Sequence, residues 1–374
     1  MNSSLKPLYP LYSNKNDSKK CLICGAKAYF SCSMCKYTNY CCTEHGNLDN
    51  EAIHKFICKM ITSFQEYDNF GTSKDERNAN LNKVNSIKQE IIGIGLKQSM
   101  ICIYKGKFEE ASSASIQALS YSIDVNSSYS EKLIEPLSIL ALSLIEWKKI
   151  EDSKNYLNQA QWISYNNKKN MRNSDLSIVN RVYGKYFSAK HLFEKALECA
   201  SLDVYHTTLD YGSGSMEMAT SLFYLGNIFE RIFEYLSESE MNRSLWTNKW
   251  NKAEILLKAD YLYDQVIFIW CEKMSFYLKE RLNKPDSFNN SEPIRYFSEV
   301  ELVKTEKILN DIKIYYRKRM VVDKIEELAT SIGRPNAQTM SDLSITMYEV
   351  LRENYVKVIT DYYGLTFLGS WKSK

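Results

Sequence analysis

Glycine and proline are scarce in this chain of 374 residues, which contains 13 glycines and 6 prolines. So few turn-forming residues argue against β-sandwiches, β-barrels and collagen-like repeats, and they favour a mostly α-helical protein. An excess of one charge is also lacking, because 48 Lys and Arg residues stand against 45 Asp and Glu residues, for a formal charge of +3. This near-balance removes bulk basicity as an argument for nucleic-acid binding.

Long hydrophobic runs and common catalytic motifs are missing as well. No apolar stretch approaches the roughly 20 residues that a membrane helix needs, and residues 1–20 lack the apolar core of a secretory signal. We therefore expect a cytoplasmic protein that binds no membrane. The chain contains no G-x-x-x-x-G-K-[ST], G-x-G-x-x-G, H-E-x-x-H or G-x-S-x-G motif. We predict that it is not an enzyme, and we assign no catalytic residue.

Cysteine, by contrast, is concentrated near the N-terminus. Seven of the ten cysteines lie between Cys21 and Cys58, beside two of the four histidines. Eight candidate ligands fall into four spaced pairs: Cys21 and Cys24, Cys32 and Cys35, Cys41 and His45, His54 and Cys58. Two closed tetrahedral zinc sites require eight such donors and keep no open position for catalysis. About 40 residues can hardly build a core of their own, so two structural Zn²⁺ ions are predicted to supply the folding free energy, on the order of 10–16 kcal/mol per site.

The order of these ligands resembles a MYND zinc finger. The resemblance implies interleaved pairs, with Cys21, Cys24, Cys41 and His45 on one zinc ion and Cys32, Cys35, His54 and Cys58 on the other. Cys42 is then a spare thiol. Peptide-binding members of the family commonly carry Gln and Trp where this chain has Gly46 and Asn50. We therefore interpret the finger as a docking surface first and as a reader of proline-rich peptides second.

Beyond residue 80 the sequence repeats with a period of 42 or 43 residues. A bulky residue expected early in a helix recurs at Phe108, Ile150, Phe193 and Tyr235. Small residues recur in the same way at Ser99, Ala141, Gly184 and Gly226. Small residues at one helix crossing and bulky ones at the other are what stacked antiparallel helix pairs require. The pattern resembles tetratricopeptide repeats of the longer kind, which implies an α-solenoid.

These signals predict the following organisation: an N-terminal extension at 1–20, the finger at 21–60, the repeats at 80–275 with an insertion at about 236–256, a linker at 276–297, and C-terminal helices at 298–374. Trp246 and Trp250 in the insertion form either a helical patch for a partner or a packing contact with the repeats. Two long helices, Ser298–Arg319 and Asp342–Tyr363, are expected to cap the end of the solenoid. Cys102, Cys199 and Cys271 are interpreted as small apolar fillers inside helices.

The combination of an N-terminal MYND finger with such repeats resembles the ciliary family of zinc finger MYND domain-containing proteins. That resemblance implies a non-enzymatic scaffold of the ciliary or flagellar axoneme, which helps to dock an inner dynein arm to doublet microtubules. It also implies protein partners, namely inner dynein arm components and a subunit like tetratricopeptide repeat protein 29. The repeat register predicts that four residues face the inner groove of the solenoid and contact a partner: Arg181, Lys185, Asn227 and Arg231.

Two alternatives remain open from the sequence. The first is a general peptide-binding adaptor outside cilia, in chaperone or corepressor work. The second is a lysine methyltransferase of the SET–MYND kind, which also joins a MYND finger to a helical tail. Its SET domain is split around the finger, however, and only 20 residues precede Cys21 here, with no Asn-His-Ser-Cys segment in the chain.

Overall fold

The computed structural model of the chain describes residues 5–7, 19–68, 73–167, 171–238, 251–283 and 298–329. Most of these residues are helical, which confirms the prediction from the low Gly and Pro content. The chain divides into an N-terminal unit, Met1–Ala189, and a C-terminal unit, Lys190–Lys374. None of the described helices combines the length and the apolarity that crossing a bilayer requires.

The N-terminal unit begins with a small antiparallel sheet and three short helical segments. The strands, in their order across the sheet, are β1 (Leu5–Pro7), β2 (Phe30–Cys32) and β3 (Asn39–Tyr40). Leu5 lies opposite Cys32, and Ser31 lies opposite Asn39. The helical segments then follow one another without a break: α1 (Thr43–Asp49), the π-helical turn η2 (Asn50–His54) and α2 (Lys55–Asp68).

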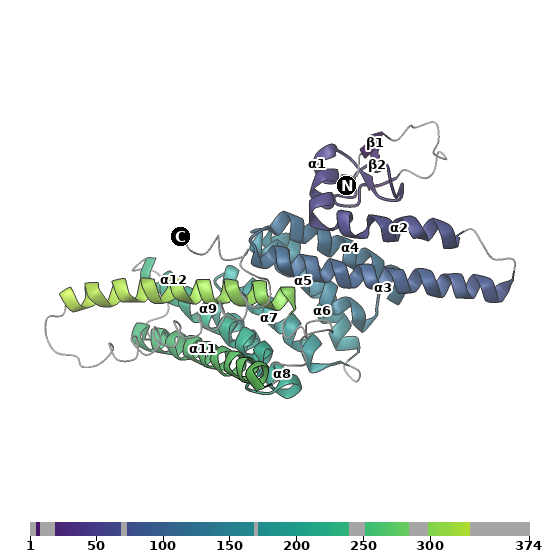
Figure 1. The fold of residues 1–374 in the computed structure, drawn as a ribbon. Helices are drawn as coiled ribbons and strands as arrows, with labels where there is room; N and C mark the ends of the chain where they lie inside the picture. Colours follow the sequence, from purple (N-terminus) through teal and green to yellow (C-terminus); the bar gives the residue numbers. More distant parts are fainter. Residues whose placement is uncertain are drawn as a thin grey trace. The chain divides into compact units, whose positions relative to one another are not determined.

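Longer helices make up the rest of this unit, and their bounds are α3 (Lys74–Tyr104), α4 (Phe108–Asn126), α5 (Ile134–Glu146), α6 (Ile150–Asn166) and α7 (Asn173–Ala189), with a short 3₁₀ turn η3 (Glu131–Leu133) before α5. Helix α3 starts at a capping box, because Ser73 Oγ accepts from the Glu76 amide and Glu76 accepts from the Ser73 amide. Consecutive helices pack against each other, α3 on α4, α4 on α5 and α5 on α6 (Figure 1).

The turns that precede α4, α6 and α8 (Phe193–Tyr211) share one geometry. Gly106, Lys148 and His191 all have positive φ angles, of 75°, 63° and 58°, and they follow one another at 42 and 43 residues. Two residues after each of them a new helix begins, at Phe108, Ile150 and Phe193. Three of the four bulky residues that the period singles out are therefore the first residues of helices.

Small residues lie where neighbouring helices approach most closely. Ser115 Oγ of α4 donates a hydrogen bond of 2.9 Å to Ser99 Oγ of α3, and both side chains are fully buried. Ala141 of α5 and Ser153 of α6 are fully buried as well. A side chain larger than serine at Ser99 would separate the axes of α3 and α4, so this contact explains the small residue of the repeating pattern at that position.

The C-terminal unit contains the four described helices α8 (Phe193–Tyr211), α9 (Met216–Glu238), α11 (Lys252–Asn283) and α12 (Glu299–Ala329). Helix α9 packs along α11, and the ring of Tyr263 lies directly over Gly226. A Cβ atom at Gly226 would lie 2.8 Å from Tyr263 Cε1, which is closer than carbon atoms pack. Only glycine fits this crossing.

The prediction that Tyr235 lies early in a helix is wrong. Tyr235 lies in the last turn of α9, which runs without interruption from Met216 to Glu238. Its ring stacks on His191 at 4.8 Å and meets Phe193 edge-on at 5.4 Å, so its size serves a contact with the start of α8. A fixed sequence period cannot reveal that α9, with 23 residues, is longer than α7, with 17.

Several predicted features lie partly or wholly outside the described residues. Residues 236–238 end α9 and residues 252–256 begin α11, while Trp246 and Trp250 lie outside the described residues. Helix α11 continues past residue 275 to Asn283, into the range predicted as a linker. Helix α12 starts at a capping box on Ser298, where that helix was predicted to begin. Residues 342–363 and most of 1–20 also lie outside the described part of the chain.

Candidate metal centre

The small sheet and the helical segments after it bring the eight predicted ligands together in two groups of four. The first group, called site A, contains Cys21, Cys24, Cys41 and His45. The second, called site B, contains Cys32, Cys35, His54 and Cys58. Within each group the sulfur and ring nitrogen atoms all lie within 4.8 Å of one another. The membership of the two groups is the one implied by the resemblance to the MYND finger.

Site A joins the loop before β2 to the end of β3 and the first turn of α1. Cys24 Sγ lies 3.5 Å from Cys41 Sγ, and His45 Nδ1 lies 3.5 Å from Cys21 Sγ and 3.1 Å from Cys41 Sγ. Cys21 is buried and Cys24 is exposed. Site A thus lies at the surface of the unit and ties its first loop to its first helix.

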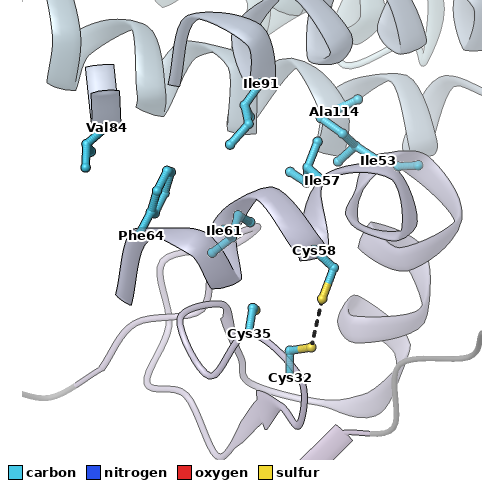
Figure 2. Close-up of a cluster of buried hydrophobic side chains, with 11 residues drawn as sticks. Cys32, Cys35, Ile53, Ile57, Cys58, Ile61, Phe64, Val84, Ile91 and Ala114 are labelled. Atoms are coloured by element: carbon cyan, nitrogen blue, oxygen red, sulfur yellow. Dashed lines mark hydrogen bonds between the residues drawn. The ribbon is translucent and has the colours of Figure 1, made fainter. Parts of the chain in front are cut away.

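Site B is entirely buried. Cys32 Sγ at the end of β2 lies 3.7 Å from Cys58 Sγ in α2 (Figure 2). Cys35 Sγ lies 3.8 Å from His54 Nε2 of η2 and 3.3 Å from Thr38 Oγ1. All four donor residues are at most 4% exposed. Site B therefore fastens the sheet to the helix that leads into the rest of the unit.

Four of the five separations between ligand atoms, at 3.5–3.8 Å, are close to the edges of a zinc tetrahedron, and the fifth, His45 Nδ1 to Cys41 Sγ at 3.1 Å, is shorter. With Zn–S bonds of about 2.3 Å and Zn–N bonds of about 2.0–2.1 Å, a regular tetrahedron has S···S edges of about 3.8 Å and S···N edges of about 3.6 Å. Disulfides would need S–S distances of about 2.05 Å, and all the cysteines concerned are free thiols. Sulfur and imidazole donors without oxygen donors favour zinc over magnesium or calcium. The donor set and its geometry fit two closed, structural zinc sites.

The thiols of each site perturb one another. Burial raises the pKa of Cys21, but hydrogen bonds from nearby backbone amides and from His45 outweigh it and lower the pKa to about 6. At site B the hydrogen bond with Cys35 is the main cause that lowers the pKa of Cys32 to about 7, and the same bond raises the pKa of Cys35. Burial, and then the charge of Cys35, raises the pKa of Cys58. Closely packed thiolates repel one another, and a divalent cation would offset that repulsion.

A buried carboxylate lies beside His54, on the side of the ring that faces away from the sulfur atoms of site B. Asp49 Oδ2 lies 3.7 Å from His54 Nδ1, while His54 Nε2 faces the sulfur atoms. This order of carboxylate, imidazole and thiolate is the arrangement that orients histidine ligands in zinc proteins. Burial raises the pKa of Asp49, and hydrogen bonds from Tyr40 and Gln117 together with the nearby His54 oppose that rise.

The same carboxylate connects the finger to helix α4. Asp49 accepts hydrogen bonds from Tyr40 Oη at 2.6 Å, from Gln117 Nε2 at 2.7 and 2.9 Å, and from Ser113 Oγ at 3.0 Å. Gln117 and Ser113 belong to α4, more than 60 residues further along the chain. No spacing rule in the sequence marks Asp49, Ser113 or Gln117 as partners, so sequence analysis missed this network.

An apolar core also joins the finger to the helices. Ile53, Ile57 and Ile61 project from η2 and α2 toward Ile91 of α3 and Ala114 of α4 (Figure 2). Cys32, Cys35 and Cys58 of site B belong to the same cluster of buried side chains. The finger therefore does not have a separate core, because its buried face is completed by α3 and α4.

Other residues singled out in the finger fall outside both sites. Cys42 Sγ lies 3.7 Å from Cys41 Sγ and belongs to neither group of four. Gly46 is buried in α1, and Asn50 is half-buried at the start of η2. Away from the finger, Cys102 is buried, and burial raises the pKa of Cys199 and of Cys271 to about 11.

The four predicted partner-binding residues have different environments. Lys185 of α7 forms an ion pair with Glu146 of α5, and Arg181 Nη2 donates to Ser177 Oγ at 3.3 Å. Asn227 Oδ1 accepts a hydrogen bond of 2.6 Å from Tyr263 Oη, which gives it a packing role within its own unit. Arg231 is exposed. Of the four side chains, that of Arg231 is the most available to a partner.

Comparison with models of known protein families gives no match for this chain.

Proposed function

We propose that this protein is a non-enzymatic scaffold in which two structural Zn²⁺ ions organise a MYND-type finger and tetratricopeptide-like helix pairs present binding surfaces for other proteins. The closed Cys₃His donor sets support a structural role for the metal, because four protein ligands leave no position for a substrate. The turns that recur after 42 and 43 residues support a repeating helix-pair architecture of the solenoid kind.

The observation that carries this proposal is the joining of the finger to the helices. A finger that shares its core with α3 and α4, and whose Asp49 is hydrogen-bonded to α4, is held as one body with those helices. A surface that is already ordered binds a partner without the free-energy cost of ordering itself. Such a unit suits a protein that holds other proteins at a fixed spacing.

The proposed site of action is the axoneme of a cilium or flagellum. There the protein would help to tether an inner dynein arm to doublet microtubules, together with a subunit like tetratricopeptide repeat protein 29. This proposal rests on the resemblance of the finger and repeats to the ciliary MYND family. Arg231, which is exposed on α9, is the side chain we expect to contact an acidic group of such a partner.

Two measurements test the proposal. Elemental analysis of the purified protein should give two zinc ions per chain, and one or none would contradict the metal assignment. Cilia extracted with detergent and then with salt should retain the protein on the doublet microtubules. Release of the protein into the soluble fraction by both detergent and salt would reject the axonemal role.

A general peptide-binding adaptor is the second candidate, and a cleft between the finger and helices α4–α6 favours it. A methyltransferase is the third, and no described residue gives it specific support. S-adenosylmethionine should leave the thermal midpoint of the protein unchanged, whereas stabilisation by that cofactor would revive the enzymatic hypothesis.

A further inference from the structure

A cleft of about 710 Å³ opens between the zinc finger and helices α4, α5 and α6 of the N-terminal unit. Cys24, His45 and Leu48 of the finger form one wall. Residues of the three helices form the other wall and the floor. Its volume lies within the range of about 300–1,000 Å³ that is typical of ligand-binding pockets. Because both the finger and the helices line it, neither part alone forms the cleft.

The floor of the cleft is apolar. Leu140 and Leu144 lie four residues apart on α5 and are buried, and Ile116 of α4 and Trp147 after α5 are half-buried beside them. Lys149 Nζ lies 3.2 Å from the centre of a Trp147 ring, so this lysine is already engaged by the indole. An apolar floor of this kind accommodates bulky aliphatic or aromatic side chains.

The rim of the cleft is acidic. Glu44 of α1, Glu109 of α4 and Asp152 of α6 all line it, and all three are exposed. No ion pair joins any of them to a Lys, Arg or His residue within the described part of the chain. Three carboxylates stand around the opening against one ammonium group, that of Lys149, so in a chain whose overall charge is +3 the rim has a local negative field that attracts cations and repels phosphate groups.

Helix α6 adds hydrogen-bonding groups to the same rim. Asp152, Asn155, Tyr156 and Gln159 occupy positions i, i+3, i+4 and i+7, which places them on one face of the helix, and all four line the cleft. The Asn155 and Gln159 carboxamides are exposed, and each offers both a donor and an acceptor. Such groups match the alternating N–H and C=O groups of an extended backbone.

We propose that this cleft binds an extended segment of a protein partner that carries lysine or arginine residues next to bulky apolar ones. The apolar residues would occupy the floor over Leu140 and Leu144, and the cationic ones would face Glu109 and Asp152. This inference builds on the proposed scaffold function, because it specifies the chemistry of one partner. A nucleic acid does not fit the cleft, since its phosphates would meet the acidic rim.

The test uses the full-length, zinc-loaded protein and an array of immobilised hexapeptides in which lysine, glutamate, leucine and serine are permuted. Fluorescence anisotropy then measures the affinity of the best-bound peptide in solution. The variant Glu109→Lys with Asp152→Lys reverses the rim. The variant Glu90→Lys with Asp124→Lys changes the net charge equally on exposed residues of α3 and α4, and neither of these two residues lines the cleft. This control variant distinguishes an effect of charge at the cleft from an effect of the net charge of the protein.

We expect the protein to select peptides that combine lysine with leucine. Their affinity should fall by about tenfold or more in the rim variant and by less than about twofold in the control variant. Asp152→Asn, which removes one charge at an exposed position, should weaken binding by a smaller factor. This single variant keeps the inference testable if the double variant does not fold. Selection of acidic or uncharged peptides, equal losses in both double variants, or no binding at 1 mM peptide would overturn the inference.

The same variants distinguish this inference from the scaffold function. A rim variant that still remains on doublet microtubules but binds no peptide would leave the cleft inference intact and show that axonemal retention uses another surface. If the wild-type protein remains on the doublets while no peptide is bound, only the cleft inference fails.

Discussion

Replacing Asp49 tests how the finger is held to the helices. In Asp49→Ala, the Tyr40, Ser113 and Gln117 donors all lose their acceptor in a site with no access to solvent. Each buried donor left without a partner costs about 1–3 kcal/mol. The unfolding free energy of the N-terminal unit should therefore fall by at least about 3 kcal/mol, a large share of the 5–15 kcal/mol that is typical of a domain.

Asp49→Asn is the matched conservative variant. It keeps the shape of the side chain, and one of its two oxygen acceptors becomes an amide donor. Gln117 can rotate its amide, and the Tyr40 hydroxyl can accept instead of donating, so the network is able to rearrange. We expect a loss of about 1–2 kcal/mol, smaller than that of Asp49→Ala. Asp124→Asn, at an exposed ion pair with Lys88, should change the stability by less than about 1 kcal/mol.

Urea unfolding of the zinc-loaded protein, followed by circular dichroism, measures these differences. A chelator titration provides the second readout, because the loss of a carboxylate behind a histidine ligand typically weakens metal affinity by about 10–100-fold. Only one of the two metal ions should be released more easily, since Asp49 lies behind His54 of site B and not behind His45 of site A. Equal stability of Asp49→Ala and wild type, or equal weakening of both sites, would refute this reasoning.

Three further predictions concern the metal ligands, a helix crossing and a half-buried thiol. Cys58→Ser should lower the zinc content from two ions to one, whereas Cys42→Ser should keep two, as elemental analysis can show. Gly226→Ala should destabilise the C-terminal unit by about 1–3 kcal/mol in urea, because its Cβ would meet a buried tyrosine ring at 2.8 Å. Gly93→Ala, with open space around the new methyl group, should be neutral or stabilising. Cys199, whose pKa burial raises to about 11, should be alkylated slowly at pH 8 and faster as the pH rises toward 11, as mass spectrometry can follow.

The features that the sequence predicted best depend on local spacing. Helix starts at Phe108, Ile150 and Phe193 follow from a repeated turn, and a turn is encoded by a few consecutive residues. The choice of the eight Cys and His residues as ligands likewise follows from their type and short spacing, whereas their division into two interleaved groups was implied by the resemblance to the MYND finger. Each of these predictions needed information from only one stretch of the chain.

The features that the sequence did not reveal depend on contacts between distant residues. Gln117 meets Asp49 across 68 residues, and Ile91 completes a core that begins at Cys32. A polar residue that is buried and satisfied looks the same in the sequence as one that is solvated. Tyr235 was misplaced for a related reason, because its size serves a contact with His191 and not the turn that the period implied.

The fusion of finger and helices has an energetic consequence for metal removal. Without zinc, the repulsion between packed thiolates opposes the folding of site B, and this site contributes Cys32, Cys35 and Cys58 to the core shared with α3 and α4. Unfolding of the finger would then uncover Ile91 and Ala114, and with them an apolar surface that water must solvate. Chelation should therefore destabilise α3 and α4 as well as the finger, whereas a finger with a core of its own would leave those helices unchanged. Hydrogen exchange of α3 and α4, measured with and without a chelator, separates these two outcomes.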